Sequence, residues 1–317
     1  MNPRPVVPPI EIGVIGLGRR GLFHLERWFD GSAVRVAAAC DRDPGARAAA
    51  ATLCGRVSAD PGSLLADPTI DAVLLAVPVA ERAALGRLVQ AAGKRLVVAD
   101  PPVAATVGEA AALNAAAADA GRPILVSAPW REEPGFRAAL AVARSGAAGR
   151  MRFLRFERWE PAAAAPGGTG AGGELPRSLV YVLDQLVALA ATPAVRVHAT
   201  GCPVEAMTVA VRFRDGLHAS VLLHADAAVR VDHGWAWDGE RGGYAAGRRW
   251  VRTADGEVYD VPAEPPPAAA FEDVLRSALA GGEPPVTSIE SLRLVALLTA
   301  VARAFRSGEV VEAEPVP

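Results

Sequence analysis

Lysine is almost absent from this chain: among 317 residues Lys94 is the only one, and arginine supplies the rest of the positive charge. Aromatic residues make up only 5% of the sequence, and the three cysteines lack the CxxC spacing of zinc and redox motifs. The net charge of −2 argues against nucleic acid or an anionic membrane surface as a partner. The apolar run from Ile10 is broken by glycines and is too short to span a bilayer. We therefore expect a cytoplasmic protein with reduced cysteines and without a metal site.

Apolar residues are plentiful, at 51% of the chain, and a length of 317 residues fits two domains. Up to residue 127, short apolar runs alternate with alanine-rich amphipathic stretches, which predicts parallel strands linked by helices in a doubly wound sheet. The predicted strands are Ile10–Ile15, Val34–Ala39, Ala72–Ala76, Leu96–Ala99 and Ile124–Val126. Residues 1–127 are thus expected to form an α/β domain of the Rossmann type.

The second half has a different pattern. Consecutive strand-like runs are separated by turn signals such as Asp215-Gly216 and Asp255-Gly256, as in an antiparallel meander. Helices are predicted at Phe136–Arg144, Arg177–Ala191 and Ser288–Ser307, and residues 161–176 form a low-complexity segment that we expect to be a loop. Residues 128–317 are therefore expected to form an α+β domain that binds substrate and supports oligomerisation.

A glycine-rich motif lies between the first predicted strand and the first helix. Gly16-Leu17-Gly18-Arg19-Arg20-Gly21 matches the GxGxxG fingerprint, and Asp41 follows at the end of the second strand. In this motif the first glycine permits a tight turn, the second lets the backbone approach a diphosphate, and the third allows close packing of helix and strand. The helix N-terminus that follows favours phosphate. The motif predicts a dinucleotide site that includes Arg19 and Arg20.

The choice of dinucleotide depends on the residues after the second strand. Asp41 would accept hydrogen bonds from the adenosine ribose and repel a 2′-phosphate, which favours NAD. Because Arg19 and Arg42 could each reach a 2′-phosphate, NADP remains the alternative. Pro78 ends the run Ala76-Val77-Pro78, which either lies beside the nicotinamide half of the cofactor or forms a simple turn.

Several segments follow one another in a characteristic order: GVIGLGRRG at 13–21, AACD at 38–41, DAVLLAVP at 71–78, AAGKRLVVADPP at 91–102, SAPWREEP at 127–134 and GGEPPVTSIES at 281–291. In this order and spacing the sequence resembles the Gfo/Idh/MocA family of NAD(P)-dependent oxidoreductases. The resemblance implies a second domain with an open, mostly antiparallel sheet and a homo-oligomer, expected to be a dimer. It also implies hydride transfer between nicotinamide and a small, sugar-like or other carbonyl or imine substrate.

The sequence departs from that family at the positions that carry its chemistry. The resemblance implies a lysine in an E-K-P motif, but this chain reads Asp100-Pro101-Pro102 there. It also implies an aspartate and a histidine four residues apart on a helix, where this chain has Arg177 and Tyr181. Asp184 matches the family pattern and is either a site residue or a structural one. The usual catalytic groups are therefore replaced.

Three functions remain open. In the first, the protein is an oxidoreductase in which Tyr181, its pKa lowered by Arg177 on the same helical face, transfers the proton. In the second, it is a catalytically inactive NAD-binding sensor or accessory protein. In the third, NAD serves a net non-redox reaction, which needs more acid–base groups than remain. We expect the first. The charges at residues 131–133 either contact substrate or lie in a solvated connection.

Overall fold

The computed structural model describes residues 9–28, 34–146, 149–160, 175–202, 205–225, 234–247, 250–252, 258–260, 275, 277–278 and 281–317. The chain divides into two compact units. The first contains Met1–Ala104, Gly108–Ser127 and Ala268–Ser288, and the second contains Ala105–Val107, Ala128–Pro267 and Ile289–Pro317.

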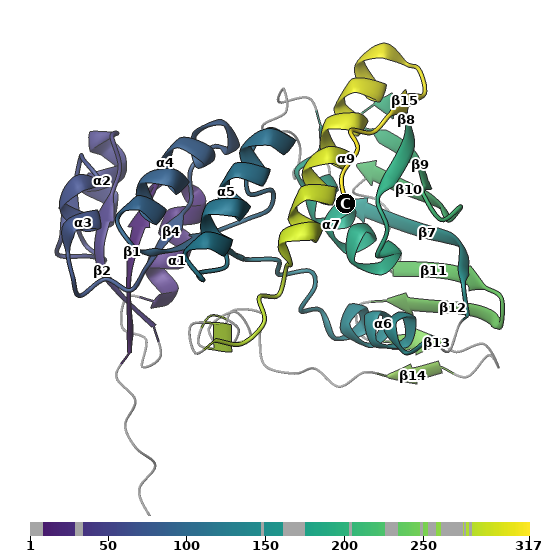
Figure 1. Ribbon diagram of the computed structural model, residues 1–317, viewed down its shortest axis with the longest axis horizontal. Coiled ribbons are helices and arrows are strands. Elements are labelled where there is room, and N and C mark those ends of the chain that lie inside the picture. Colours follow the sequence, from purple (N-terminus) through teal and green to yellow (C-terminus); the bar gives the residue numbers. More distant parts are fainter. Residues whose placement is uncertain are drawn as a thin grey trace, which may run out of the picture. The chain divides into compact units, whose positions relative to one another are not determined.

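A six-stranded sheet forms the centre of the first unit, and every strand pair in it is parallel (Figure 1). Its order is β3-β2-β1-β4-β5-β6, so the strand order reverses beside β1. The strands are β1 Ile10–Ile15, β2 Val34–Cys40, β3 Val57–Ser58, β4 Ala72–Leu75, β5 Arg95–Val98 and β6 Leu125–Val126. The doubly wound sheet expected from the sequence is confirmed. The strand β3 was not predicted, because two residues are too few to make an apolar run.

Helices connect these strands: α1 Arg19–Trp28, α2 Pro44–Ala50, α3 Gly62–Ala66, α4 Val79–Ala91 and α5 Val107–Asp119. The start of α2 shows how the sequence sets an element boundary. Asp43 is the N-cap and accepts a hydrogen bond from the amide of Gly45 at 2.6 Å, while Pro44 stands at a position that needs no amide donor. Ligands of such sheets bind at the carboxyl ends of the strands, beside the reversal of strand order.

The segment Ala268–Ser288 groups with the first unit, whereas the sequence places it in a domain spanning 128–317. Leu275 and Ala278 are buried in the core of the first unit, and the guanidinium of Arg95 donates to the carbonyl of Ala278 at 3.0 Å. A few apolar residues distant in sequence give no periodic signal, so this return of the chain could not be read from the pattern.

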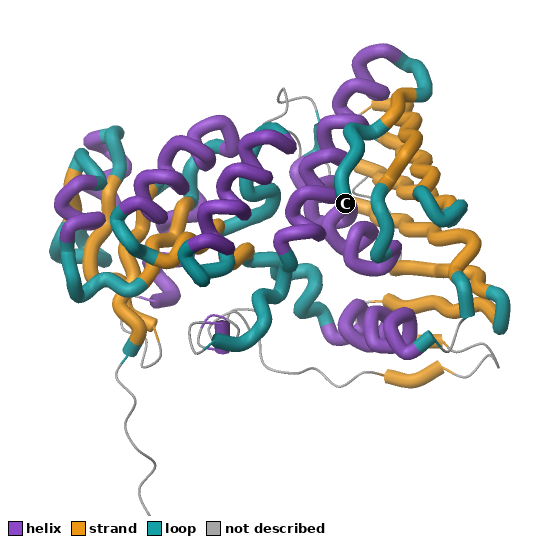
Figure 2. The backbone as a smooth tube through the Cα atoms, in the orientation of Figure 1, coloured by secondary structure: helices purple, strands orange, loops and turns teal. Residues whose placement is uncertain are grey.

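The described strands of the second unit form one mixed sheet of order β14-β13-β12-β11-β7-β10-β9-β8-β15. Its strands are drawn in orange in Figure 2 and labelled in Figure 1. Only the pair β7–β10 is parallel among these described strands, so the sheet is mostly antiparallel, as expected. The strands are β7 Met151–Glu160, β8 Ala194–Cys202, β9 Ala206–Phe213, β10 His218–Ala225, β11 Gly234–Gly239, β12 Gly242–Gly247, β13 Trp250–Arg252, β14 Val258–Asp260 and β15 Val311–Glu312.

Three described helices belong mainly to the second unit: α6 Pro134–Ser145, α7 Arg177–Ala190 and α9 Ser288–Ser307. Strand residues alternate between buried and exposed, as in β9, so that one face packs into a core shared with α7 and α9. Trp235 and Trp237 lie on that face and are buried. Residues 161–174 of the predicted loop lie outside the described residues. No helix in the described part of the chain is long and apolar enough to cross a membrane.

Candidate functional site

Two glycines of the GxGxxG motif are required by the fold of the protein itself. Gly16 has φ of +97°, and a Cβ there would lie 2.7 Å from the carbonyl oxygen of Ala76. A Cβ on Gly21 would lie 1.8 Å from the carbonyl oxygen of Gly16. These two positions therefore keep β1, β4 and α1 close together, as the motif predicts.

Gly18 is different, because a Cβ at this position would meet nothing within 4 Å and the residue is exposed. The protein itself therefore does not demand glycine at this position. The open space lies directly before Arg19, the first residue of α1, where the amides of a helix N-terminus attract anions. Open space beside a helix N-terminus fits a diphosphate that needs close approach to the backbone.

The carboxylate of Asp41 ties the end of β2 to the glycine loop. Its Oδ2 accepts from the amide of Leu17 at 2.6 Å, and its Oδ1 accepts from the amide of Asp43 at 2.8 Å. Its backbone carbonyl accepts from the guanidinium of Arg47 at 2.9 Å. Each carboxylate oxygen can accept a further hydrogen bond, so this fixed carboxylate remains able to bind a ribose hydroxyl.

The other residues predicted for the cofactor lie on the rim of this loop. Arg42 is 81% exposed and its guanidinium lies 2.9 Å from the carboxylate of Glu81. Arg19 is exposed at the start of α1, and Pro78 is exposed immediately before α4. Their contacts with a cofactor stay predictions.

Two arginines hold the turn Asp100-Pro101-Pro102, which follows β5. Arg20 donates from Nε to the carboxylate of Asp100 at 2.7 Å and forms an ion pair with it. Arg82 is buried and donates to the carbonyls of Asp100, at 2.6 Å, and of Pro102. A guanidinium keeps its charge at all ordinary pH values, so neither arginine can replace a lysine in proton transfer.

The sole lysine is engaged elsewhere in the first unit. The ammonium of Lys94 donates to the carbonyl of Asp67 at 2.5 Å and to that of Ile70 at 2.8 Å, both in the loop before β4. This loop leads into the amino end of the strand, whereas the glycine loop follows the carboxyl end of β1. Lys94 therefore holds the sheet at the end opposite to the predicted cofactor site.

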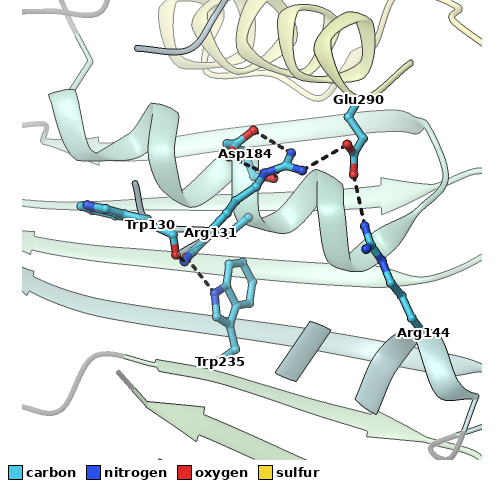
Figure 3. A network of polar contacts seen from close by, with 7 residues as sticks. Trp130, Arg131, Arg144, Asp184, Trp235 and Glu290 are labelled. Carbon is cyan, nitrogen blue, oxygen red and sulfur yellow. Dashed lines mark hydrogen bonds and ion pairs between the residues drawn. The ribbon is translucent and has the colours of Figure 1, made fainter. Parts of the chain in front are cut away.

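In the second unit, Asp184 lies on α7 and is only 1% exposed. The guanidinium of Arg131 donates to both of its carboxylate oxygens at 2.7 Å (Figure 3). Arg131 also lies 3.1 Å from Glu290, and Glu290 lies 3.9 Å from Arg144. Two cations and two anions thus balance in one network. Of the two interpretations for residue 131, neither a solvated connection nor direct substrate contact fits a side chain that is 4% exposed and bonded in this way.

Burial and pairing act in opposite directions on this network. Burial raises the pKa of Asp184, and the attraction of Arg131 opposes that shift. Burial also lowers the pKa of Arg131, but its interactions with Asp184 and Glu290 outweigh this effect and leave the pKa raised. The guanidinium therefore stays charged, and both carboxylate oxygens of Asp184 are engaged in hydrogen bonds with Arg131. The geometry suits Asp184 to positioning and leaves it no direct access to a substrate.

Next to Asp184, Gln185 fixes the chain that follows the first unit. Its amide donates to the carbonyl of Trp130 at 2.6 Å, and its carbonyl accepts from the indole of Trp235 at 3.0 Å. The indole of Trp130 packs against the ring of Tyr181, with centroids 5.0 Å apart. The guanidinium of Arg158 lies 3.8 Å from the centroid of the same indole. Tyr181 and Arg158 are thus grouped around Trp130.

Tyr181 is half-buried on α7, and the helix begins at Arg177, whose side chain lies outside the described residues. Three residues of this region were not predicted from the sequence: Gln185, Glu290 and Arg158. A polar residue in the apolar run of α7 is a signal for Gln185, but Glu290 lies more than 100 residues away and no pattern links it to Asp184. Among the described residues, no group of three His, Cys, Asp or Glu residues could hold a metal ion.

Residues 10–128 match the model of the oxidoreductase family GFO_IDH_MocA, which has an NAD-binding Rossmann fold. The chain is 29% identical over 147 residues to a 1-carboxy-3-chloro-3,4-dihydroxycyclohexa-1,5-diene dehydrogenase of Comamonas testosteroni. It is 30% identical over 138 residues to a D-apiose dehydrogenase of Paraburkholderia graminis. These matches span 46% and 43% of this chain and 37% and 36% of the two relatives, so the chain matches little more than a third of each relative.

The likeness in structure extends over both units. A scyllo-inositol dehydrogenase of Lactobacillus casei, solved with NAD(H) and scyllo-inositol, superposes with a TM-score of 0.78 at 19% identity. The superposition covers 96% of this chain and 99% of that one. At this identity the likeness shows a shared fold.

Proposed function

We propose that the chain is an oxidoreductase of the Gfo/Idh/MocA type, because residues 10–128 match the NAD-binding Rossmann model of that family, and that it reduces a small, sugar-like carbonyl or imine compound with NADH. The observation that carries the proposal is the open space above Gly18, between the start of α1 and the fixed carboxylate of Asp41. When bound, the nicotinamide supplies a hydride at C4.

The first unit binds and orients that cofactor. The backbone at Gly18 and the first amides of α1 would hold the diphosphate. The carboxylate of Asp41, held by the amides of Leu17 and Asp43, would accept hydrogen bonds from the hydroxyls of the adenosine ribose and would repel a 2′-phosphate. This arrangement favours NAD over NADP, although Arg42 and Arg19 stand on the rim where a 2′-phosphate would lie.

A non-standard residue supplies the proton. Reduction of a carbonyl or imine needs a proton at the oxygen or nitrogen as hydride reaches the carbon. Proline occupies the position of the family lysine, and the arginines that hold this turn do not release protons. Tyr181 is a phenol that follows Arg177 by four residues on α7, a spacing at which two helical side chains can interact. We assign the proton transfer to Tyr181 with Arg177 as its partner.

Asp184 acts through Arg131. The guanidinium of Arg131 donates to both oxygens of the Asp184 carboxylate. Together with the hydrogen bond from Gln185 to the carbonyl of Trp130, this pair attaches residues 130 and 131 to α7. Trp130 is thereby held against Tyr181. We therefore place Asp184 in the site as a positioning residue.

The substrate class follows from the relatives. One of the two relatives is a dehydrogenase of a dihydroxylated ring acid and the other is a dehydrogenase of the sugar D-apiose, while the solved neighbour holds the cyclic polyol scyllo-inositol. Their shared chemistry is a carbon that carries a hydroxyl among other hydroxyls. The corresponding oxo compounds are the candidates for reduction by this protein.

The test follows the transferred hydrogen. NADH deuterated at C4 is incubated with the protein and pooled keto-sugars, oxo acids and imines, and the products are examined by mass spectrometry. Deuterium on the reduced carbon of a product supports the proposal. If NADH binds but no pool yields label at protein concentrations in the micromolar range, the oxidoreductase assignment fails.

A second function is favoured by two observations. Asp184 is enclosed in an ion pair and proline stands at the lysine position, as expected for a protein that binds NAD(H) without chemistry. Such a sensor or accessory protein would bind NADH, change its melting temperature and leave the label on the cofactor. Failure of millimolar NADH to shift the melting temperature or the tryptophan fluorescence would exclude both functions.

A further inference from the structure

Three polar residues lie on one face of α7: Ser178, Tyr181 and Gln185. Tyr181 follows Ser178 by three residues and Gln185 follows it by seven, which places them on the same side of a helix. We call this row of residues the polar stripe. Gln185, at one end, is hydrogen-bonded to the carbonyl of Trp130 and to the indole of Trp235. Ser178, at the other end, is 6% exposed, and its hydroxyl has no hydrogen-bond partner among the described residues. A buried hydroxyl without a partner is costly, so it points to a group that the protein binds.

Arg158 brings a cation to the same stripe. Its guanidinium lies over the indole of Trp130, which also contacts the ring of Tyr181. Stacking on an aromatic face fixes the plane of a guanidinium and therefore the directions of the N–H donors on its edge. A guanidinium has five N–H donors, so it can bind a carboxylate in addition to another acceptor.

The start of α7 adds to this preference for a negative group. Pro176 precedes the helix, and no side-chain hydrogen bond caps it among the described residues. The positive end of a helix dipole lies there, in the same turn as Ser178. A hydroxyl, a guanidinium and a helix N-terminus together favour an anion with several acceptor atoms.

We infer that Ser178 and Arg158 form a substrate subsite for a carboxylate beside Tyr181, so that the substrate is a small oxo or imino acid. This inference rests on the proposed function and names its substrate class. The carboxylate accepts from Arg158 and Ser178, and the oxo oxygen accepts the proton of Tyr181. The oxo carbon is reduced by hydride from NADH, NADH becomes NAD⁺, and the phenol regains its proton from solvent.

The test compares carboxylates with neutral counterparts on the NADH-loaded protein. Binding is measured by saturation-transfer NMR for two pairs, pyruvate with methyl pyruvate and D-glucuronate with D-glucose. We expect each carboxylate to bind more tightly than its neutral partner. Arg158→Gln and Ser178→Ala should each weaken binding of the carboxylate roughly ten- to hundredfold. Arg158→Lys, which keeps the positive charge, should lose less of this affinity. Arg155→Gln is the matched control, because Arg155 is an exposed residue of the same strand paired with Glu157.

A structural role for these residues gives a different result. Ser178→Ala removes a hydroxyl without a described partner, so its melting temperature should not fall, whereas loss of a structural bond would lower it. The inference is overturned if neither carboxylate is preferred, or if both variants bind carboxylate as the parent protein does. If deuterium is transferred to oxo compounds without any preference for acids, the carboxylate subsite is wrong but the proposed reduction stands. If carboxylates bind in a way that depends on Arg158 but no deuterium is transferred, the proposed reduction is wrong but the subsite stands.

Discussion

Gly18 and Gly21 stand in one motif, but only Gly21 is demanded by the packing of the protein. A Cβ on Gly21 collides with the backbone oxygen of Gly16, while one on Gly18 enters open space. Gly21→Ala should therefore lower the melting temperature. Gly18→Ala should change the melting temperature by no more than about 2 °C. It should weaken the binding of NADH by about tenfold or more, since a methyl group would occupy the space of the diphosphate. Melting curves and NADH titrations of the two variants check this, and equal NADH affinity for Gly18→Ala and the parent would contradict it.

Asp67 shows how a hydrogen-bonded carboxylate couples folding to pH. Its carboxylate accepts from the hydroxyl of Thr69 at 2.6 Å and from the amide of Thr69, and it pairs with Arg56 at 2.7 Å. These interactions lower its pKa from 3.8 to about 2, with the Thr69 hydroxyl as the largest cause. Because the folded pKa is depressed, the stability it provides is complete above about pH 4 and is lost as the pH falls towards 2.

Asp67→Asn should therefore be less stable than the parent protein at pH 6, and the difference should shrink as the pH falls from 5 to 3. Urea midpoints at each pH measure it. Asp119→Asn, an exposed carboxylate at the end of α5, provides the matched control and should show no such convergence. A difference that stays constant with pH would show that the charge of Asp67 does not matter.

Single residues were predicted unevenly from the sequence. The positions of Gly16, Gly21 and Asp41 follow from a local motif whose spacing encodes strand, turn and helix, and the structure brings them together. The contacts Arg20–Asp100 and Arg131–Glu290 join residues far apart in the chain. Such pairs depend on which elements become neighbours, and that information is absent from local spacing.

At the scale of elements, α7 is fixed to the chain at residues 130 and 131 by buried polar bonds. Asp184→Asn should destabilise the protein by about 3 kcal/mol, because it removes the bidentate partner of the buried Arg131 and leaves Glu290 as the one anion facing two cations in this network. Unfolding by urea, followed by tryptophan fluorescence, measures the change. Glu309→Gln, an exposed acid just beyond α9, should have no measurable effect. If the two variants unfold at the same urea concentration, the ion pair does not stabilise this element.

The elements themselves were largely predictable. Apolar runs and turn residues located most strands of both sheets, because buried strands need continuous or alternating apolar residues. The two-residue strands β3 and β15, the break between β12 and β13, and the packing of Leu275 in the first unit were not predicted. These features are set by neighbouring strands and helices and have no periodicity of their own.

At the scale of the whole molecule, a bound dinucleotide should raise the stability of the folded protein by mass action. At a concentration of one hundred times the dissociation constant the gain is about 2.7 kcal/mol. NADH should raise the melting temperature more than NADPH does at equal concentration, because Asp41 disfavours a 2′-phosphate. Asp41→Asn should narrow the difference between the cofactors. A larger increase in melting temperature with NADPH than with NADH would contradict this and would indicate that Arg42 and Arg19 bind the 2′-phosphate.

In the proposed reaction Tyr181 delivers the proton while NADH delivers the hydride. The single-turnover rate of NADH oxidation in Tyr181→Phe, measured with the compound that first accepts deuterium, tests this role. Phenylalanine keeps the ring that packs on Trp130 and removes only the hydroxyl. We predict a rate lower by about a hundredfold or more with NADH affinity unchanged. A rate in Tyr181→Phe equal to that of the parent protein would exclude Tyr181 as the proton donor.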